Sequence, residues 1–238
     1  RTWKDQFFKN TLETLLRPVG EVETQHEVAS PDAQWADVWF EPHPALGPQR
    51  DSLGWLGKMS EQACLFESFS DAPSELEIRG CLRKLLTKQH LRESAAAAEQ
   101  KPWPALPKLW ILAPSLRASH AQNYGLTSAE PWPEGIFISP PGFGLAWISL
   151  RDLAPVRETL LLRFQAIEGP VFQQALRELI ALPSDAPEKQ AAKQILVARR
   201  FEVTKNAASH PEDEAWTMNY TELYAEWEQE KLNEGRRE

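Results

Sequence analysis

The sequence is poor in cysteine and has no long apolar run, and each shortage excludes a class of protein. Cys64 and Cys81 are the only cysteines, and each lies in an apolar periodic segment, so two buried free thiols are favoured over a disulfide or a zinc site. No stretch approaches the roughly 18 apolar residues that span a bilayer, and no charged-then-apolar signal segment opens the chain. We therefore expect a soluble, cytoplasmic protein without a membrane partner.

Basic residues are also in the minority, with 26 lysines and arginines against 34 aspartates and glutamates and a formal net charge of -8. Since domains that bind nucleic acid broadly carry basic patches, this balance leaves room only for a local binding surface. The candidate surface is one predicted helix that carries Arg79, Arg83, Lys84 and Lys88, whereas the acidic excess falls largely in 212–238. A solvated helix face is the alternative interpretation.

The chain does have enough apolar residues, 42% of 238, for one large domain or a domain with an appendage. Hydrophobic periodicity and turn residues predict its first half in order. The expected elements are a helix over 2–16, a hairpin of strands 21–28 and 35–40 around a turn at 30–34, a strand over 63–69, a helix from Ser74 to about 98, and a buried strand over 109–113. The last three elements form a parallel βαβ unit.

A second hairpin, of strands 135–139 and 145–150, should extend the sheet. A loop is expected over 42–51. Beyond Leu153 the residue pattern is typical of helices. The expected helices there cover 156–166, 171–182 and 187–203, followed by a polar linker at 206–214 and a charged helix from Thr221. The predicted fold class is therefore α/β, a mixed central sheet flanked by helices and followed by a helical C-terminal region. We expect a core at 1–153, a helical region at 154–205 packed on it, and a linker and charged helix at 206–238 through which a homodimer would form.

Two acidic residues interrupt apolar strands. Asp37 lies within Trp35-Ala-Asp-Val-Trp-Phe40, and Glu67 directly follows the apolar run 63–66. Either the strands reach solvent at these points, or the carboxylates are held for chemistry. Carboxylates on adjacent strands can converge on one divalent cation, and hard oxygen ligands suit Mg²⁺ or Mn²⁺. Asp37 and Glu67 are thus the candidate metal ligands.

The order of elements and several short segments resemble one bacterial family. The segments are Asp5-Gln-Phe-Phe-Lys9, Ala36-Asp37-Val38, Leu65-Phe-Glu-Ser-Phe-Ser-Asp71 leading to Ile78-Arg79, Arg157-Glu-Thr-Leu-Leu-Leu-Arg-Phe164, Gln174-Ala-Leu-Arg-Glu-Leu-Ile-Ala-Leu-Pro183 and Tyr220-Thr-Glu-Leu-Tyr-Ala-Glu-Trp227. In these the chain resembles the recombination-promoting nuclease / transposase family, within the PD-(D/E)XK nuclease superfamily. The resemblance covers nearly the whole chain and implies a PD-(D/E)XK-like core.

The resemblance also implies roles for individual residues. Asp37 matches the strand aspartate that ligates the metal, and Glu67 matches the acid of the (D/E)XK element. Asp5 and Glu13, on the first helix, are candidates for a further helical acid. The implied activity is endonucleolytic hydrolysis of phosphodiester bonds in DNA by water activated on Mg²⁺ or Mn²⁺.

The chain departs from the family pattern at Phe69, where the (D/E)XK element normally has lysine. A phenyl ring supplies neither charge nor a hydrogen bond, so we expect a basic residue of the crossover helix, Arg79 or Lys84, to replace it. The loss of one preorganised electrostatic contact costs on the order of 100 to 1000-fold in rate. The alternative is therefore a catalytically degenerate nuclease fold that binds nucleic acid or a partner protein. A coiled-coil assembly through the tail is a third hypothesis, which the lack of sustained heptads disfavours.

Overall fold

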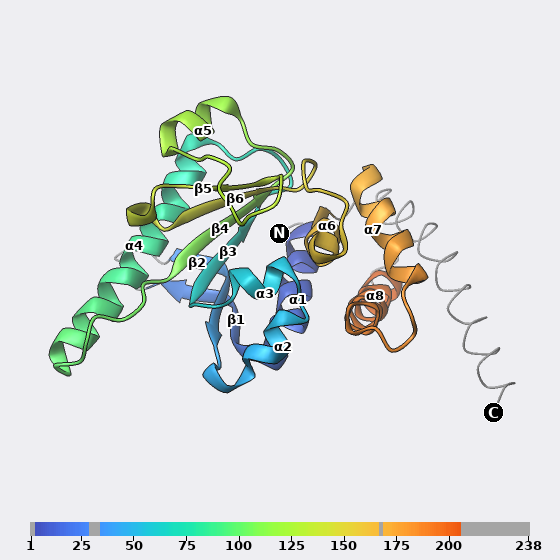
Figure 1. Ribbon diagram of the computed structural model, residues 1–238, viewed down its shortest axis with the longest axis horizontal. Coiled ribbons are helices and arrows are strands. Elements are labelled where there is room, and N and C mark those ends of the chain that lie inside the picture. The colour runs from blue at the N-terminus through green and yellow to red at the C-terminus, as the bar shows by residue number, and fades with distance from the viewer. Residues whose placement is uncertain (1–2, 29–33, 167–168, 206–238) are drawn as a thin grey trace, which may run out of the picture. The chain divides into compact units, whose positions relative to one another are not determined.

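The structure is a computed structural model that describes residues 3–28, 34–166 and 169–205. Its centre is a six-stranded mixed sheet with helices packed around it (Figure 1). In chain order the helices and strands are α1 (Trp3–Leu16), β1 (Gly20–Val28), β2 (Gln34–Pro42), α2 (Gly47–Asp51), α3 (Trp55–Met59), β3 (Cys64–Ser68), α4 (Glu75–Ala98), β4 (Lys108–Ala113), α5 (Ala118–Tyr124), β5 (Ile136–Ile138), β6 (Leu145–Ser149), α6 (Leu160–Arg163), α7 (Gly169–Ala181) and α8 (Pro187–Lys205). The predicted α/β class, with a mixed central sheet and flanking helices, is confirmed.

The strands lie in the order β1-β2-β3-β4-β6-β5. β1, β2 and β3 pair antiparallel, β3, β4 and β6 pair parallel, and β5 pairs antiparallel with β6. Both predicted hairpins and the βαβ unit β3-α4-β4 are confirmed. Because β3, β4 and β6 run in one direction, their carboxyl ends meet at one edge of the sheet, which is the edge where α/β proteins place ligands.

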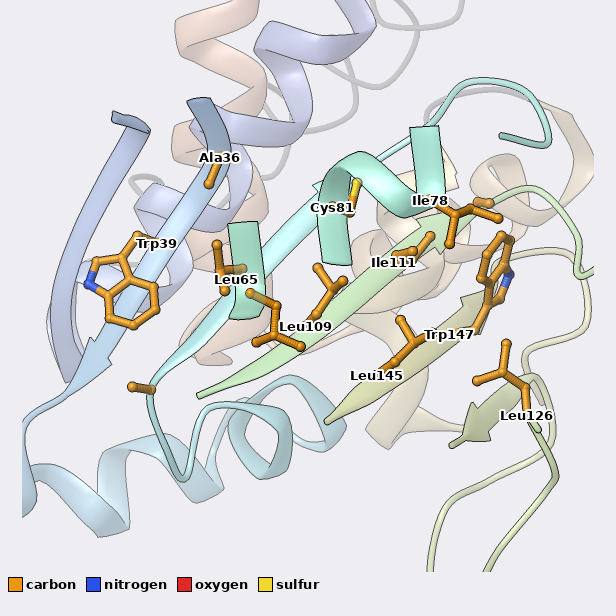
Figure 2. Close-up of a cluster of buried hydrophobic side chains, with 13 residues drawn as sticks. Ala36, Trp39, Leu65, Ile78, Cys81, Leu109, Ile111, Leu126, Leu145 and Trp147 are labelled. Carbon is orange, nitrogen blue, oxygen red and sulfur yellow. The ribbon is translucent and has the colours of Figure 1, made fainter. Parts of the chain in front are cut away.

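The crossover helix α4 packs on one face of the sheet through a stripe of buried residues. Ile78, Cys81 and Leu85 are spaced at three and four residues, so they share one side of the helix. Figure 2 shows Ile78 and Cys81 beside the strand residues that belong to the same cluster, Leu65, Leu109 and Ile111. Each fully buried side chain of this kind contributes about 1.5–3 kcal/mol. Cys64 and Cys81 are both buried and free, as predicted.

Two segments differ from the sequence prediction. The expected loop at 42–51 contains the short helix α2, in whose first turn Pro48 is accommodated because no backbone N–H is needed there. The expected continuous helix at 156–166 is instead divided into 3₁₀ turns at 157–159 and 164–166 around α6. Its side chains explain the division, because Thr159 Oγ1 and Arg163 Nη2 both donate to the carbonyl oxygen of Val156, at 2.9 Å and 3.0 Å, and tighten the turn.

The chain forms two compact units, one up to Leu179 and one from Ile180. In the second unit Lys189 Nζ donates to the carbonyl oxygens of Ile180 and Leu182, at 2.8 Å and 3.0 Å, which ties α8 to the segment before it. The predicted division at 153/154 stays a prediction. The expected turn around 30–33, the linker at 206–214 and the charged helix from Thr221 lie outside the described residues. Among the described helices, none combines the length and apolarity that a bilayer crossing requires.

The start of α4 depends on a capping box, which gives a test of the fold. Ser74 Oγ accepts from the Glu77 backbone N–H at 3.3 Å, while Glu77 Oε2 accepts from the Ser74 backbone N–H at 2.7 Å. Ser74→Ala is expected to lower the free energy of unfolding by about 1 kcal/mol because it removes this cap. Urea denaturation of the full chain measures the loss. Ser94→Ala, on the exposed surface of the same helix, is the control and should be neutral or slightly stabilising, so an equal loss there would contradict the capping account.

Candidate functional site

The two strand acids lie side by side at the carboxyl end of β3. In the β2–β3 ladder Trp39 pairs with Leu65 and Val38 with Phe66, so the same register brings Asp37 opposite Glu67. Residues opposite each other in an antiparallel pair project from the same face of a sheet. Asp37 Oδ2 also accepts from the Ser68 backbone N–H at 3.0 Å, which fixes its carboxylate against the end of β3. The predicted convergence of these two residues is therefore present.

Each acid has a lysine partner from a helix. Lys9 of α1 lies between two carboxylates, with Nζ 2.8 Å from Asp5 Oδ1 and 3.0 Å from Asp37 Oδ1. Lys84 of α4 donates to Glu67 Oε1 at 2.8 Å. Lys9 is 3% exposed and Glu67 is 4% exposed, so the charges at the centre of the group are screened little by water. We call Asp5, Lys9, Asp37, Glu67 and Lys84 the acid–lysine cluster.

The cluster shifts the protonation of its most buried acid. Burial raises the pKa of the Glu67 carboxyl to about 7, the Asp37 charge adds to the rise, and the Lys84 ammonium opposes it. For Lys84, burial acts to lower the pKa, but Glu67 and the other nearby groups outweigh it and the net direction is upward. Near neutral pH, Glu67 is thus poised between its charged and neutral forms, while Lys84 stays charged.

The structure places the other sequence candidates elsewhere. Glu13, the alternative helical acid, pairs with Arg17 on its own helix and is not brought to the cluster. Arg79 is exposed and lies 3.7 Å from Glu75, away from Glu67. Of the two basic residues proposed to replace the missing lysine, the structure brings only Lys84 beside the strand acids.

The remaining basic residues of α4 point to different surroundings. Arg83 is exposed on the helix surface. Lys88 lies over the ring of Trp39, 4.2 Å from its centroid, and its Nζ is 2.8 Å from His26 Nε2. His26 in turn stacks on Trp39 with the ring centroids 5.9 Å apart. The expected role of Arg79, Arg83, Lys84 and Lys88 in nucleic-acid binding stays a prediction.

A cavity of about 690 Å³ adjoins the acid–lysine cluster. It lies where β3, β4 and β6 end, and its lining includes Asp5 and Ser68, so one acid of the cluster and the residue whose amide holds Asp37 both face it. Phe69, at the usual lysine position, also lines the cavity and packs against the core cluster under α4. A volume between about 300 and 1,000 Å³ is usual for small-molecule sites.

Sequence reasoning missed Lys9 as a member of the cluster, although it lies in a quoted family segment. The spacing of Asp5 and Lys9, four positions apart on a predicted helix, indicates their ion pair. It gives no sign of the second contact, from Lys9 to Asp37, because that contact depends on how α1 crosses β2.

The acid–lysine cluster offers only a few ligands to a hard divalent cation. Within the described residues no group of three or more His, Cys, Asp or Glu side chains is arranged to hold a metal. Mg²⁺, however, is commonly held by one or two carboxylates together with phosphate oxygens of the substrate and water. Asp37 and Glu67 supply two carboxylates here, and each already has a lysine partner, at 3.0 Å and 2.8 Å. Comparisons with protein-family models, curated proteins and solved structures find no match to this chain.

The raised pKa of Glu67 predicts a pH-dependent stability. Because the carboxyl titrates near 7 in the folded chain and near its ordinary value of 4.5 when unfolded, the folded state binds more protons in between, and its stability falls as pH rises towards 7. Glu67→Gln removes this dependence. The free energy of unfolding of wild type relative to Glu67→Gln should therefore fall between pH 5 and 7, by at most about 1.4 kcal/mol per unit.

Urea denaturation in the presence of a chelator, at several pH values, measures the difference. Glu61→Gln is the matched control, since Glu61 forms an exposed ion pair with Lys58 and surface pairs contribute little to stability. A constant difference between wild type and Glu67→Gln from pH 5 to 7 would contradict the assigned titration.

Proposed function

We propose that the chain is a metal-dependent endonuclease of the PD-(D/E)XK kind, which hydrolyses phosphodiester bonds in DNA, with recombination or mobile elements as the expected setting. The observation that carries the proposal is the placement of Asp37 and Glu67 on paired strands with the Lys84 ammonium 2.8 Å from Glu67. Two carboxylates and a cation at the carboxyl edge of parallel strands are suited to phosphate chemistry.

Asp37 and Glu67 are the residues that would hold Mg²⁺ or Mn²⁺. When bound, the cation supplies charge neutralisation at the scissile phosphate and lowers the pKa of water. The chain's own contribution is to hold the carboxylates in place. Asp37 is fixed by the Ser68 amide at 3.0 Å, and Lys9, at 3.0 Å from its other oxygen, acts as a positioning residue.

Lys84 is proposed as the functional replacement for the lysine of the (D/E)XK element. Phe69 packs against the hydrophobic cluster and cannot carry charge to the site. The Lys84 ammonium approaches from α4 instead and reaches the same carboxylate, Glu67. Because its pKa is raised, the group remains positive at neutral pH and can stabilise negative charge that develops on a phosphate oxygen.

A DNA strand would approach the cluster beside α4. Arg79 and Arg83 are exposed on this helix, four residues apart, and form a local basic face on a chain whose net charge is -8. Two such contacts give weak, salt-dependent attraction to the phosphate backbone. They support a local rather than an extensive DNA surface.

A second candidate, a binding module without turnover, is supported by the same ion pairs. Lys9 and Lys84 already neutralise Asp37 and Glu67, so the acids are stable without a cation. Buried pairs of this kind occur as purely structural elements, and breaking one costs about 3–5 kcal/mol. In such a protein the acid–lysine cluster would hold α1 and α4 on the sheet, and exposed surfaces elsewhere would bind nucleic acid or a partner protein.

Cleavage of supercoiled plasmid DNA with Mn²⁺ or Mg²⁺ tests the nuclease proposal. Asp37→Asn and Glu67→Gln are expected to lower the rate by at least about 100-fold, and Lys84→Met by about 100 to 1000-fold, because each removes a charge from the reacting site. Circular dichroism of each variant checks that it remains folded.

The exposed pair Lys58–Glu61, also 2.8 Å long, provides matched controls, and Lys58→Met and Glu61→Gln should cut at the wild-type rate. Cutting by Asp37→Asn at that rate would identify a contaminant. Absence of both cutting and Mn²⁺ binding in the wild-type chain, measured by calorimetry, would favour the binding module.

A further inference from the structure

The cavity beside the acid–lysine cluster contains an unexplained buried amide. Gln165, in the 3₁₀ turn after α6, lines the cavity and is 2% exposed. Within the described part of the chain its Oε1 has no hydrogen-bond partner, while its Nε2 makes one long contact, 3.5 Å, to the Leu161 carbonyl. Native proteins rarely leave a buried acceptor unpaired, because the lost hydration costs about 1–3 kcal/mol. The cavity is therefore suited to a ligand that brings an N–H or O–H donor.

The same cavity has features that suit an anion. Arg151, directly after β6, lines it, and within the described residues the exposed Arg151 guanidinium forms no ion pair. The first turn of α7, a helix of 13 residues, also lines it through Gly169 and Val171. The start of a helix presents unpaired backbone N–H groups and the positive end of the helix dipole, although Pro170, which also lines the cavity in this turn, has no N–H to contribute.

The rest of the lining combines polar residues, among them Lys4, Ser68 and Ser70, with an apolar wall. Phe69, Pro114 and Leu150 contribute a ring and aliphatic surface from the ends of three neighbouring parallel strands. Asp5 is the acid in the lining, and its charge is offset by Lys9 at 2.8 Å. A planar ring with an N–H donor, joined to a phosphate, matches this combination of an apolar wall, a buried acceptor and a basic rim.

We propose that this cavity binds a single nucleotide unit. Its base lies against Phe69 and donates an N–H to Gln165 Oε1, and its phosphate faces Arg151 and the first turn of α7. The choice of a nucleotide rests on the proposed nuclease function, and the cavity would hold one unpaired nucleotide next to the strand acids. Ser68 connects the two places, because it lines the cavity while its amide holds Asp37.

Two ligands could supply the same base and phosphate, a free mononucleotide and an unpaired nucleotide of a DNA strand. Calorimetric titration of the wild-type chain in EDTA, where no metal-dependent cutting occurs, separates them. The probes are the four deoxynucleoside 5′-monophosphates, a short single-stranded oligonucleotide and the matching duplex. We expect saturable binding to one site per chain by the single strand, the duplex binding at least tenfold more weakly. Binding by a monophosphate that also displaces the strand would show that free nucleotides are accepted.

Two variants assign the binding to the cavity. Gln165→Leu should weaken binding at least tenfold because it removes the acceptor. Arg151→Ala, at an exposed position, should weaken binding of a phosphate-bearing probe at least tenfold and leave a nucleoside without phosphate unaffected. Gln173→Leu, on the exposed side of α7, is the matched control and should bind as wild type.

Failure of every probe to bind, or unchanged binding by both Gln165→Leu and Arg151→Ala, would overturn the inference. Its failure is distinguishable from that of the nuclease proposal. If the chain cuts DNA but binds no nucleotide in the cavity, only the nucleotide-binding inference is refuted. If it binds a nucleotide but shows no metal-dependent cutting, only the nuclease proposal is refuted.

Discussion

The ion pair between Lys84 and Glu67 is the constraint on which the rest of the site depends. A carboxylate that is 4% exposed would be costly to ionise without a partner, and α4 supplies one from across the sheet face. The stripe of Ile78, Cys81 and Leu85 seats the helix, and Lys84, one residue before Leu85, then reaches the end of β3. The packing of α4 on the sheet therefore also positions the Lys84 ammonium at the end of β3.

Much of the architecture was predictable because it follows from the spacing of apolar and capping residues over short stretches of the sequence. The alternation in 21–28, the apolar run at 109–113 and the Ser74-x-x-Glu77 box each depend on neighbouring residues alone, and the structure confirms the corresponding strands and helix. The sequence also singled out Asp37 and Glu67, because an acid in an apolar strand is unusual. The predicted hairpin pairs β1 with β2, however, so it did not itself determine the β2–β3 pairing that brings the two acids together. Phe69 at the lysine position pointed to α4 as the source of a compensating cation.

The parts that escaped prediction depend on contacts between distant segments. Lys9 reaches Asp37 across 28 positions, and Arg151 and Gln165 meet at the cavity only because β6 and the turns around α6 end at one edge of the sheet. The broken helix around 157–166 shares this origin in part, because the local bonds from Thr159 and Arg163 to the Val156 carbonyl are joined by a contact from Arg163 to Glu178 on α7, at 3.0 Å from its Oε1. Such tertiary contacts override helix propensity without leaving a periodic signal.

The register between β2 and β3 has a consequence for variation in the chain. Because successive residues of a strand face opposite ways, inserting one residue within either strand would turn its acid to the other surface and separate the pair. The segment 43–63, which joins these strands through α2 and α3, is under no such restriction. Within it Leu56 and Met59 are buried, whereas Asp51 and Ser52 are exposed, so insertions at 51–52 would leave the geometry of the two carboxylates intact.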